Sequence, residues 1–452
     1  MHEYLIVNAT LVNWSPRQIE ADRAVLVRGD RIAEIGSAAD LRARHPDVRE
    51  VHDAKGKLLL PGNICAHTHF YGAFARGMAI PGAPAKDFPE ILRKLWWPLD
   101  KSLTLDDVRL SAQVCLVDAI KHGTTTLIDH HASPNAIDGS LSTIADVVTD
   151  AGLRAVLCYE VTDRDGEEKA QAGIAENVRF LRVTDAYPTV RATFGLHASL
   201  TLSDETLRAC VAANSAFGGG FHIHVAEHEA DEYDSLQRSG LRTVQRLYKE
   251  NILGARTIVA HGVHIDDAEM ALLYNTNTWL THQPRSNMNN AVGAAQIDKM
   301  LGLGIKVCLG NDGFSNDMWS EWKAAYLLHK VTSRDPRAAN GEHIARIAGD
   351  HNARLAEMFF PGTQIGKIAA GAVADLILMD YHPFTPLTEG NLPWHVLFGF
   401  ESSMLCATIV AGRVLMWDRQ LTTLDEAAIA ADARSKVPAV WERYQQFATS
   451  VE

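Results

Sequence analysis

The feature that most constrains the fold is a unit that recurs eight times between residues 58 and 312. Each unit begins with a short apolar, β-branched run that ends in polar residues, and a stretch long enough for a helix follows. The runs cover residues 58–69, 124–131, 154–162, 191–199, 220–228, 257–264, 278–284 and 306–312. Nearly continuous apolar runs are typical of strands buried on both faces. Joined by helical crossovers, the runs predict an α/β fold of the (β/α)₈ TIM-barrel type over residues 60–360.

An open, doubly wound sheet would produce the same alternation of strands and helices, so periodicity alone leaves that alternative open. However, the first run is not followed by the GxGxxG loop that would support a dinucleotide-binding sheet. The barrel is therefore the preferred interpretation.

The two ends of the chain have a different pattern from the central region. Residues 3–58 contain short strands with turn signals, and Gly29-Asp30 is placed to close a hairpin. The C-terminal stretch from 374 to 421 repeats this pattern. The predicted additional domains are a small β-sandwich built from residues 1–59 and 361–425, and a C-terminal amphipathic helix over 426–452.

Composition is typical of a globular protein, with 47% apolar and 22% charged residues among 452. No apolar stretch approaches the roughly 20 residues that a membrane helix needs. The N-terminal sequence MHEYLIVNATLVNW lacks the basic region and cleavage pattern of a secretory signal. We therefore expect a soluble, cytoplasmic protein.

Cysteine spacing and net charge exclude other classes. The six cysteines are spread singly, without a CxxC pair, and most lie in apolar runs, which indicates buried thiols rather than disulfides or a thiolate metal site. The net charge of −12 is not accompanied by a basic patch, which argues against nucleic acid or an acidic membrane as a partner. A small, neutral or weakly charged molecule is the expected ligand.

Histidine and carboxylate residues end most of the eight runs. In a parallel barrel the active site lies at the carboxyl ends of the strands, so these residues are expected to converge. They are His67 and His69; Asp129, His130 and His131; His197; His222, His224, Glu227 and His228; His261 and His264; His282; and Asp312. Histidines with only a structural role in the core would not be concentrated at the ends of the runs in this way. The pattern therefore predicts a metal site.

The HxH motif in PGNICAHTHFY illustrates the geometry. Residues two apart on a strand point to the same side, so His67 and His69 converge on one volume. Alone, such a pair is more often two hydrogen-bonded histidines at a strand end. His222 and His224 share a face in the same way, and spacing does not distinguish which of them binds metal.

Three histidines and an aspartate from different strands suit a catalytic zinc ion, which keeps one position open for water. Such a metal lowers the pKa of its water from 15.7 toward about 7. Because the chain has no CxxC pair to supply cysteine ligands at these strand ends, the thiolate zinc site of the nucleobase deaminases that carry HxE and CxxC motifs is excluded.

The motifs PGNICAHTH, HVAE, VAH and LGNDG resemble, in this order, the metal motifs of the amidohydrolase superfamily. The resemblance covers essentially the whole chain and is strongest to the mononuclear aminohydrolase branch, which includes guanine deaminase and triazine hydrolases. It implies that one divalent metal is bound by His67, His69, His224 and Asp312. Zinc is the first expectation, with iron or manganese as alternatives. No lysine ends the fourth run, where binuclear members carry a carbamylated bridge, so one metal is expected.

The resemblance also implies catalytic roles. Asp312 would take a proton from the water, Glu227 would carry a proton to the substrate and the leaving group, and His261 would stabilise the tetrahedral centre. The expected reaction displaces ammonia or an amine from an sp² carbon of a nitrogen heterocycle. Alternatives are opening of a cyclic amide, displacement of a halide from a heteroaromatic ring, and a relative that keeps the fold as a non-catalytic scaffold.

Four further residues are weaker candidates for substrate contact: His197, His131, Arg76 and Trp97. Each has a structural alternative, because a histidine or arginine near a strand end can buttress a site and aromatic pairs on helices are more often core. The roles of His264 and His282 are left open. By resemblance alone, a homo-oligomer is expected.

Overall fold

The computed structural model describes residues 2–448, and its central part is a barrel of parallel strands. The barrel strands are β6 (Asn63–Thr68), β7 (Thr124–Asp129), β8 (Arg154–Leu157), β9 (Val190–Ala192), β10 (Phe194–Ala198), β11 (Phe221–Val225), β12 (Ile258–His261), β13 (Trp279–His282) and β14 (Lys306–Leu309). Strands β6 and β7 are buried along their whole length, as expected for strands covered on both faces.

Two hydrogen-bonded sheets, β6–β9 and β10–β14, make up the barrel. They share its fourth strand, because β9 and β10 are consecutive segments separated by Thr193, of which β9 pairs with β8 and β10 with β11. Parallel bridges close the seams between Val161 and Leu196 and between Thr68 and Asp312. The predicted (β/α)₈ barrel is confirmed.

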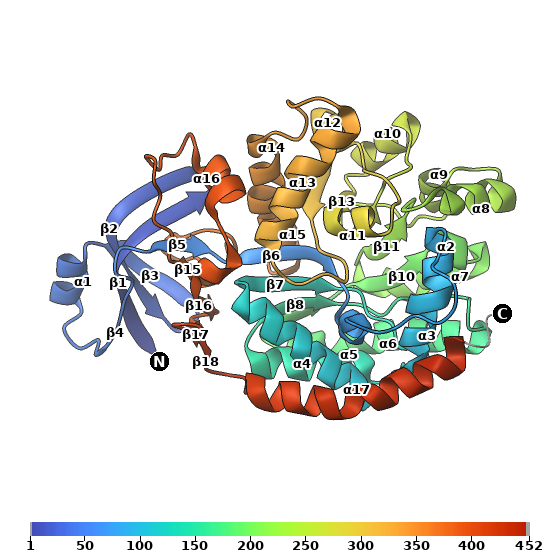
Figure 1. Ribbon diagram of the computed structural model, residues 1–452, viewed down its shortest axis with the longest axis horizontal. Coiled ribbons are helices and arrows are strands. Elements are labelled where there is room, and N and C mark those ends of the chain that lie inside the picture. The colour runs from blue at the N-terminus through green and yellow to red at the C-terminus, as the bar shows by residue number, and fades with distance from the viewer. Residues whose placement is uncertain (1, 449–452) are drawn as a thin grey trace.

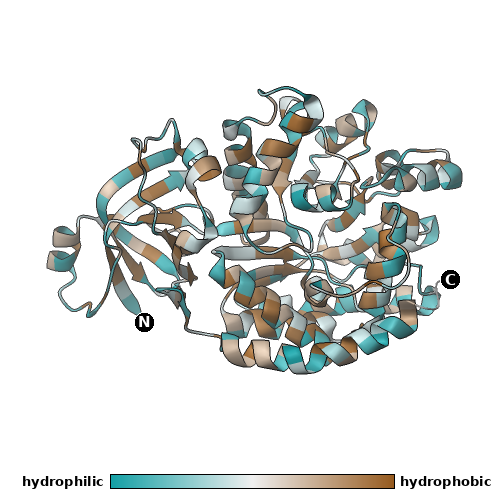
Figure 2. Ribbon diagram, in the orientation of Figure 1, coloured by the Kyte–Doolittle hydropathy of each residue, from teal (hydrophilic) through white to brown (hydrophobic). Residues whose placement is uncertain are grey.

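Helices cover the outside of the barrel between successive strands (Figure 1). They are α4 (Leu105–Lys121), α5 (Ser140–Ala151), α6 (Glu167–Val183), α7 (Asp204–Asn214), α8 (Glu229–Ser239), α9 (Thr243–Lys249), α10 (Asp267–Asn275), α11 (Pro284–Asn289), α12 (Ile297–Gly302), α13 (Met318–Ser333), α14 (Gly341–Ala345) and α15 (Asn352–Phe359). Before α4, the loop after β6 forms α2 (Phe88–Ile91), a π-helical turn (Leu92–Trp96) and α3 (Trp97–Ser102). Figure 2 shows apolar residues concentrated along the barrel strands and hydrophilic residues interspersed along the outer helices.

Both ends of the chain contribute strands to a second unit beside the barrel (Figure 1). Its strands are β1 (Glu3–Trp14), β2 (Arg17–Arg28), β3 (Arg31–Gly36), β4 (Glu50–Asp53), β5 (Leu58–Pro61), β15 (Leu376–Met379), β16 (Leu405–Val410), β17 (Arg413–Trp417) and β18 (Gln420–Leu421). They are hydrogen-bonded in the order β18-β17-β16-β15-β5-β1-β2-β3, with β4 beside β1. The unit also carries α1 (Ala38–Arg44) and α16 (Leu392–Gly399). The predicted hairpin at Gly29-Asp30 is present, since Arg28 pairs with Arg31.

The first apolar run, 58–69, is two strands rather than one. Its first part is β5, which pairs with β1 and β15 of the terminal unit, and its second part is β6 of the barrel. The chain passes between them at Gly62, where an added Cβ would lie 2.2 Å from the Thr125 side chain. Only glycine fits this close crossing without displacing β7.

A buried ion pair connects the two units. Arg154, at the start of β8, donates from Nε to Asp375 Oδ2 at 2.9 Å and from Nη2 to Oδ1 at 3.2 Å. The two side chains are 4% and 2% exposed. Because a buried charge without its partner is costly, this pair fixes the barrel against β15.

The last helix, α17 (Glu426–Ala448), runs along the outside of the barrel beneath α4 (Figure 1). Trp441 anchors it by donating from Nε1 to the Phe74 carbonyl at 2.9 Å. The final residues of the C-terminal helix expected from the sequence, 449–452, lie outside the described residues. Among the residues that are described, no helix is both long and apolar enough to cross a membrane.

Candidate active site

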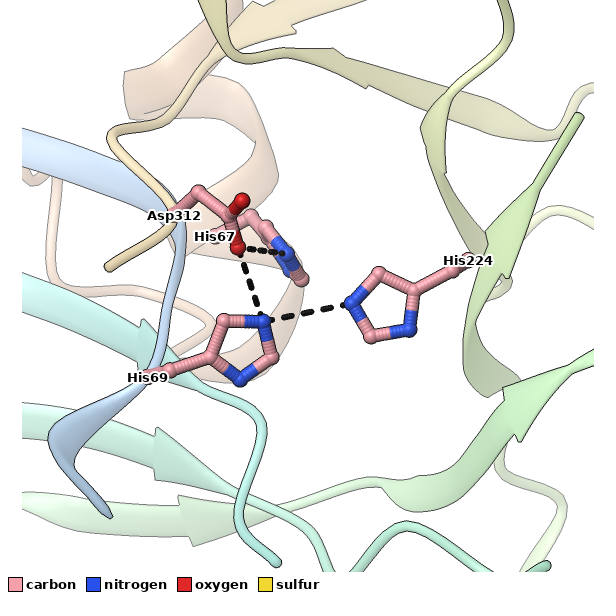
Figure 3. A group of neighbouring side chains, drawn as sticks. All are labelled: His67, His69, His224 and Asp312. Carbon is pink, nitrogen blue, oxygen red and sulfur yellow. Dashed lines mark hydrogen bonds and ion pairs between the residues drawn. The ribbon is translucent and has the colours of Figure 1, made fainter. Parts of the chain in front are cut away.

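Four side chains from the ends of three barrel strands, β6, β11 and β14, meet at the carboxyl end of the barrel (Figure 3). His67 lies in β6, His69 directly follows it, His224 lies in β11 and Asp312 follows β14. One potential ligand atom from each lies within 4.8 Å of the other three. These are the four residues that the sequence predicts as metal ligands, and the structure brings them together.

Hydrogen bonds to backbone carbonyls fix the orientation of two of these imidazole rings. His69 donates from Nδ1 to the His130 carbonyl at 2.6 Å, and His224 donates from Nδ1 to the His197 carbonyl at 2.8 Å. A carbonyl oxygen only accepts, so the proton of each neutral ring is on Nδ1 and the lone pair is on Nε2. Such bonds are the usual way in which proteins orient histidine ligands.

The Nε2 atoms of His69 and His224 face each other, and neither carries a proton to donate in the neutral ring. The Nε2 atoms of His69 and His224 are 3.2 Å apart, and two lone pairs at that distance repel each other unless a proton or a cation lies between them. His67 Nε2 is buried and lies 3.4 Å from Asp312 Oδ1, and it has no closer polar partner among the described residues. Three imidazole nitrogens and a carboxylate oxygen aimed at one point fit a divalent metal ion of the zinc type.

The electrostatics of the cluster favour a cation at its centre. Burial lowers the pKa of His67 to about 3, which keeps this imidazole neutral. Burial acts in the same direction on His69, but the neighbouring Asp312 outweighs it and raises the pKa of His69 to about 9. Although burial alone would raise the pKa of Asp312, the neighbouring imidazoles of His67 and His69, 3.4 and 2.9 Å from its Oδ1, hold this pKa well below its usual range. A proton and a metal therefore compete for the same position beside Asp312.

His222 lies on the outer side of the cluster. Its Nε2 is 2.8 Å from His67 Nδ1, the nitrogen of His67 that points away from Asp312, and its Nδ1 is 3.9 Å from Cys158 Sγ. His224 instead directs Nε2 toward His69. Of the two histidines that spacing did not separate, His224 belongs to the candidate metal group and His222 supports His67.

The loop after β14 holds Asp312 in a constrained conformation. Asp312 has a φ of +56°, and Thr68 donates to its carbonyl oxygen at 3.0 Å. Ser286, in α11, donates to Asp312 Oδ2 at 2.5 Å, while Asp312 Oδ1 lies 2.9 Å from His69 Nε2. Gly310 permits this arrangement, because a Cβ there would meet the His67 backbone at 2.7 Å.

Glu227 and His261 adjoin the metal cluster on the side of Asp312. Glu227 Oε2 lies 3.4 Å from His261 Nε2, and Asn290 donates to Glu227 Oε1 at 3.3 Å. The other nitrogen of His261, Nδ1, is 2.9 Å from Asn287 Oδ1. Burial raises the pKa of the Glu227 carboxyl, which is the direction a proton carrier at neutral pH requires.

A cavity of about 280 Å³ opens above the cluster. Tyr71, Phe88, Trp96 and Trp97 form an aromatic part of its wall. Three of the four candidate ligands, His69, His224 and Asp312, line its floor together with Glu227. Glu160, Arg164 and His197 line another side. A cavity with apolar walls and a few polar groups is suited to a small planar molecule.

The weaker candidates for substrate contact are placed differently from one another. His197 and Trp97 line the cavity, and His197 donates or accepts at Nδ1 with Thr201 Oγ1 at 2.7 Å. His131 is fully buried outside the cavity lining, where its Nε2 is 2.9 Å from Ser133 Oγ. Arg76 lines a neighbouring, more polar cavity of about 480 Å³ that shares Trp96 with the first.

Three other strand-end histidines lie around the site. His282 pairs with His329 through their Nε2 atoms at 3.0 Å, and His264 Nε2 lies 3.0 Å from the Val292 carbonyl. Neither lines the cavity above the metal cluster, whereas His228 does.

Sequence reasoning missed Glu160 and Arg164. Glu160 follows β8, lines the cavity and is 2% exposed. Arg164 pairs with Asp100 and has its guanidinium carbon 5.4 Å from the Trp97 ring centroid. The strand-end pattern could have identified Glu160, because it is a polar residue near the end of the third apolar run, AVLCYEVT. Arg164 lies in the loop after β8 and Asp100 in the short helix α3, and neither residue ends one of the apolar runs, so the sequence pattern did not indicate them.

The barrel and the four side chains that converge at the carboxyl ends of its strands are typical of metal-dependent hydrolases. Comparison with known families agrees, since residues 58–415 match the model of the amidohydrolase family. Residues 24–47 match an imidazolonepropionase-like composite domain of bacteria. The chain belongs to the amidohydrolase family, whose members hydrolyse carbon–nitrogen bonds, and the resemblance inferred from the motifs is confirmed.

Individual relatives cover nearly the whole chain. A 5'-deoxyadenosine deaminase of Methanobrevibacter smithii is 31% identical over 429 residues, which are 92% of this chain and 94% of the relative. The zinc-bound crystal structure of an adenosine deaminase from Xanthomonas campestris has a TM-score of 0.85 at 22% identity, covering 98% of both chains. The zinc complex of atrazine chlorohydrolase from Arthrobacter aurescens has a TM-score of 0.79 at 20% identity, covering 96% of this chain and 100% of that one.

Proposed function

We propose that this protein is a metal-dependent aminohydrolase that displaces ammonia from an amino-bearing sp² carbon of a nitrogen heterocycle. The observation that carries the proposal is the convergence of the four candidate metal ligands with Glu227 and His261. Of these residues, His69, His224, Asp312 and Glu227 line one cavity. The deaminase names of relatives that match almost the whole chain support the same reaction.

His67, His69, His224 and Asp312 are the proposed ligands of one divalent metal ion. Zinc is the first choice, since the donor set suits it and two structurally similar proteins were crystallised with zinc. Iron and manganese are alternatives that the same donors accept. When bound, such an ion supplies a water molecule that ionises near neutral pH.

The chain's own groups then handle the protons. Asp312, held by Ser286, accepts a proton from the water and directs its oxygen toward the substrate carbon. Glu227 donates its proton to the ring nitrogen beside that carbon, then takes up the proton that Asp312 received from the water and passes it to the leaving amino group. The hydroxyl proton of the tetrahedral carbon returns Glu227 to its protonated form. His261, with Asn287 at its far nitrogen, donates to the oxygen that becomes negative as the carbon turns tetrahedral. A C–O bond forms, the C–N bond breaks, and ammonia leaves.

Hydrolytic displacement of a halide is the second candidate, since a chlorohydrolase is among the similar structures. Glu227 favours departure of nitrogen, because an amine must be protonated before it leaves and chloride need not be. The aromatic wall of Tyr71, Trp96 and Trp97 suits either type of heteroaromatic ring.

Two measurements on the purified full chain test the proposal. Elemental analysis gives its metal content, and an assay measures ammonia release from purines, pterins, pyrimidines and triazines. We expect a bound divalent metal and ammonia release from at least one amino-substituted ring. Chloride or a ring-opened product without ammonia would favour the alternatives. Release of nothing from a metal-loaded protein would favour a scaffold role.

We further propose a cytoplasmic location and a homo-oligomeric state for the enzyme. Light scattering coupled to size exclusion measures the mass in solution, and a mass equal to one 49.6 kDa chain would contradict the second proposal.

A further inference from the structure

Glu160 is a buried carboxylate in the cavity wall whose capacity to accept hydrogen bonds is only partly used. It is 2% exposed. Among the described residues its side chain has two partners: Oε2 is 3.2 Å from His130 Nδ1, and Oε1 is 3.5 Å from Arg164 Nη2. A carboxylate has about four lone-pair sites. Glu160 can therefore accept further hydrogen bonds on the side that faces the cavity.

Glu160 and Glu227 lie in opposite electrostatic environments. Burial raises the pKa of Glu227. Burial also acts to raise the pKa of Glu160, but His197, His130 and Arg164 outweigh it and lower this pKa to about 2. Two carboxylates whose pKa values are pushed apart are typical of sites where one holds a proton and the other stays ionised. Glu160 suits the role of a permanent acceptor.

The two carboxylates have different neighbours around the metal cluster. Glu227 groups with His261 and Asp312, whereas Glu160 groups with His197 and His224 and also with His69 and His130, each group within 4.8 Å. A planar ring held over the cluster would present one edge to Glu227 and another to Glu160. Because Glu160 lies so close to His224, it reaches an atom of the reacting ring itself rather than a substituent near the cavity mouth.

We propose that Glu160 determines specificity by accepting a hydrogen bond from a ring N–H next to the reacting carbon. The inference rests on the aminohydrolase function proposed above. The substrate class that satisfies both carboxylates is a cyclic guanidine. Its amino-bearing carbon is flanked by an unprotonated ring nitrogen toward Glu227 and by a ring N–H toward Glu160. During hydrolysis the amino group leaves as ammonia, oxygen from water takes its place, and this N–H is unchanged.

Rings of the adenine type lack this donor. The reacting carbon of adenine has a ring nitrogen on one side and a carbon without hydrogen on the other, and the nearest nitrogen beyond it is an acceptor. Such a ring would leave the ionised Glu160 without a partner in a desolvated site, which is costly. The structure therefore favours guanine, isocytosine or pterin over adenosine.

The first test uses the metal-loaded wild-type chain. Ammonia release is measured as kcat/KM for guanine, isocytosine and pterin, and for adenosine, 5'-deoxyadenosine and cytosine. We expect the first group to exceed the second by at least about tenfold, the low end for a hydrogen bond to a charged group. 1-Methylguanine, which lacks the donor, should fall below guanine by a similar factor. Quenching of tryptophan fluorescence from Trp96 and Trp97 in the cavity wall reports binding of the same rings without turnover.

The second test uses Glu160→Gln. This variant keeps the shape of the side chain and removes its charge, and we expect a loss of about 10–100-fold on guanidine rings with little change on the adenosine group. Asp165→Asn is the matched control, because Asp165 lies 3.4 Å from Arg164 Nε and 2.6 Å from Lys101 Nζ but does not line the cavity. It should leave the preference between rings unchanged. Metal content and unfolding temperature show whether each variant is intact.

Equal turnover of guanine and 1-methylguanine by the wild type overturns the inference even if Glu160→Gln does not fold. A uniform loss on all rings in Glu160→Gln also overturns it. Ammonia from the adenosine group alone overturns the Glu160 inference and leaves the proposed function standing. No ammonia from any ring overturns both.

Discussion

Replacing Glu227 by glutamine tests whether its carboxyl carries the proton. Glu227 is 7% exposed, and its two oxygens face Asn290 at 3.3 Å and His261 at 3.4 Å. Glutamine has nearly the same shape and can still accept from Asn290, so the fold and the four candidate ligands should be undisturbed. What disappears is the exchangeable proton. We expect kcat to fall by about 10²–10⁴, the usual contribution of a positioned acid or base.

That loss corresponds to about 3–5 kcal/mol of transition-state stabilisation, at 1.36 kcal/mol for each factor of ten. The assay is steady-state ammonia release, with the metal content of the same sample measured by elemental analysis. Glu229→Gln is the matched control, because Glu229 is an exposed acid two residues further along, at the start of α8, and should change kcat by less than about twofold. If Glu227→Gln retained full activity with metal bound, the proton-transfer role would be refuted.

Three further changes test the surroundings of the site and the fold. Ser286→Ala removes the 2.5 Å hydrogen bond to Asp312 and should weaken metal binding by about 10–100-fold in a chelator competition; an unchanged affinity would contradict the positioning role. Asp375→Ala leaves Arg154 buried and unpaired and should lower the free energy of unfolding by about 3–5 kcal/mol in urea, whereas a loss below 1 kcal/mol would show that the pair does not hold the units together. Gly62→Ala forces a Cβ to 2.2 Å from Thr125 and should cost about 1–3 kcal/mol, while Gly254→Ala, with no atom within 4 Å of its added Cβ, should cost less; equal effects would argue against the tight crossing at Gly62.

Much of the barrel could be predicted because its strands are buried on both faces and therefore appear as continuous apolar runs. Details that depend on how strands pair in the folded chain could not be predicted from the sequence. The run 58–69 is uniformly apolar, yet it belongs to two sheets, and only the contact of Gly62 with Thr125 in the folded chain reveals the crossing. The break in the fourth strand at Thr193 likewise depends on which neighbour each half pairs with.

The candidate metal site could be predicted because the carboxyl ends of the strands in a parallel barrel converge independently of the conformation of the loops. His222 and His224 share a strand face, and the choice between them depends on where the ring nitrogens point, which spacing does not encode. His131 is turned into the core and Arg76 toward a neighbouring cavity for the same reason. Residues that converge from loops, such as Arg164, have no periodicity that would reveal them.

The most direct test of the account is a chelator titration in which metal content and the rate of ammonia release are measured on the same samples. We predict one divalent ion per chain, a rate that falls in proportion to the ion removed, and recovery when zinc is restored. Full ammonia release from protein whose metal content has fallen to nearly zero would contradict the central claim that His67, His69, His224 and Asp312 form a catalytic metal site.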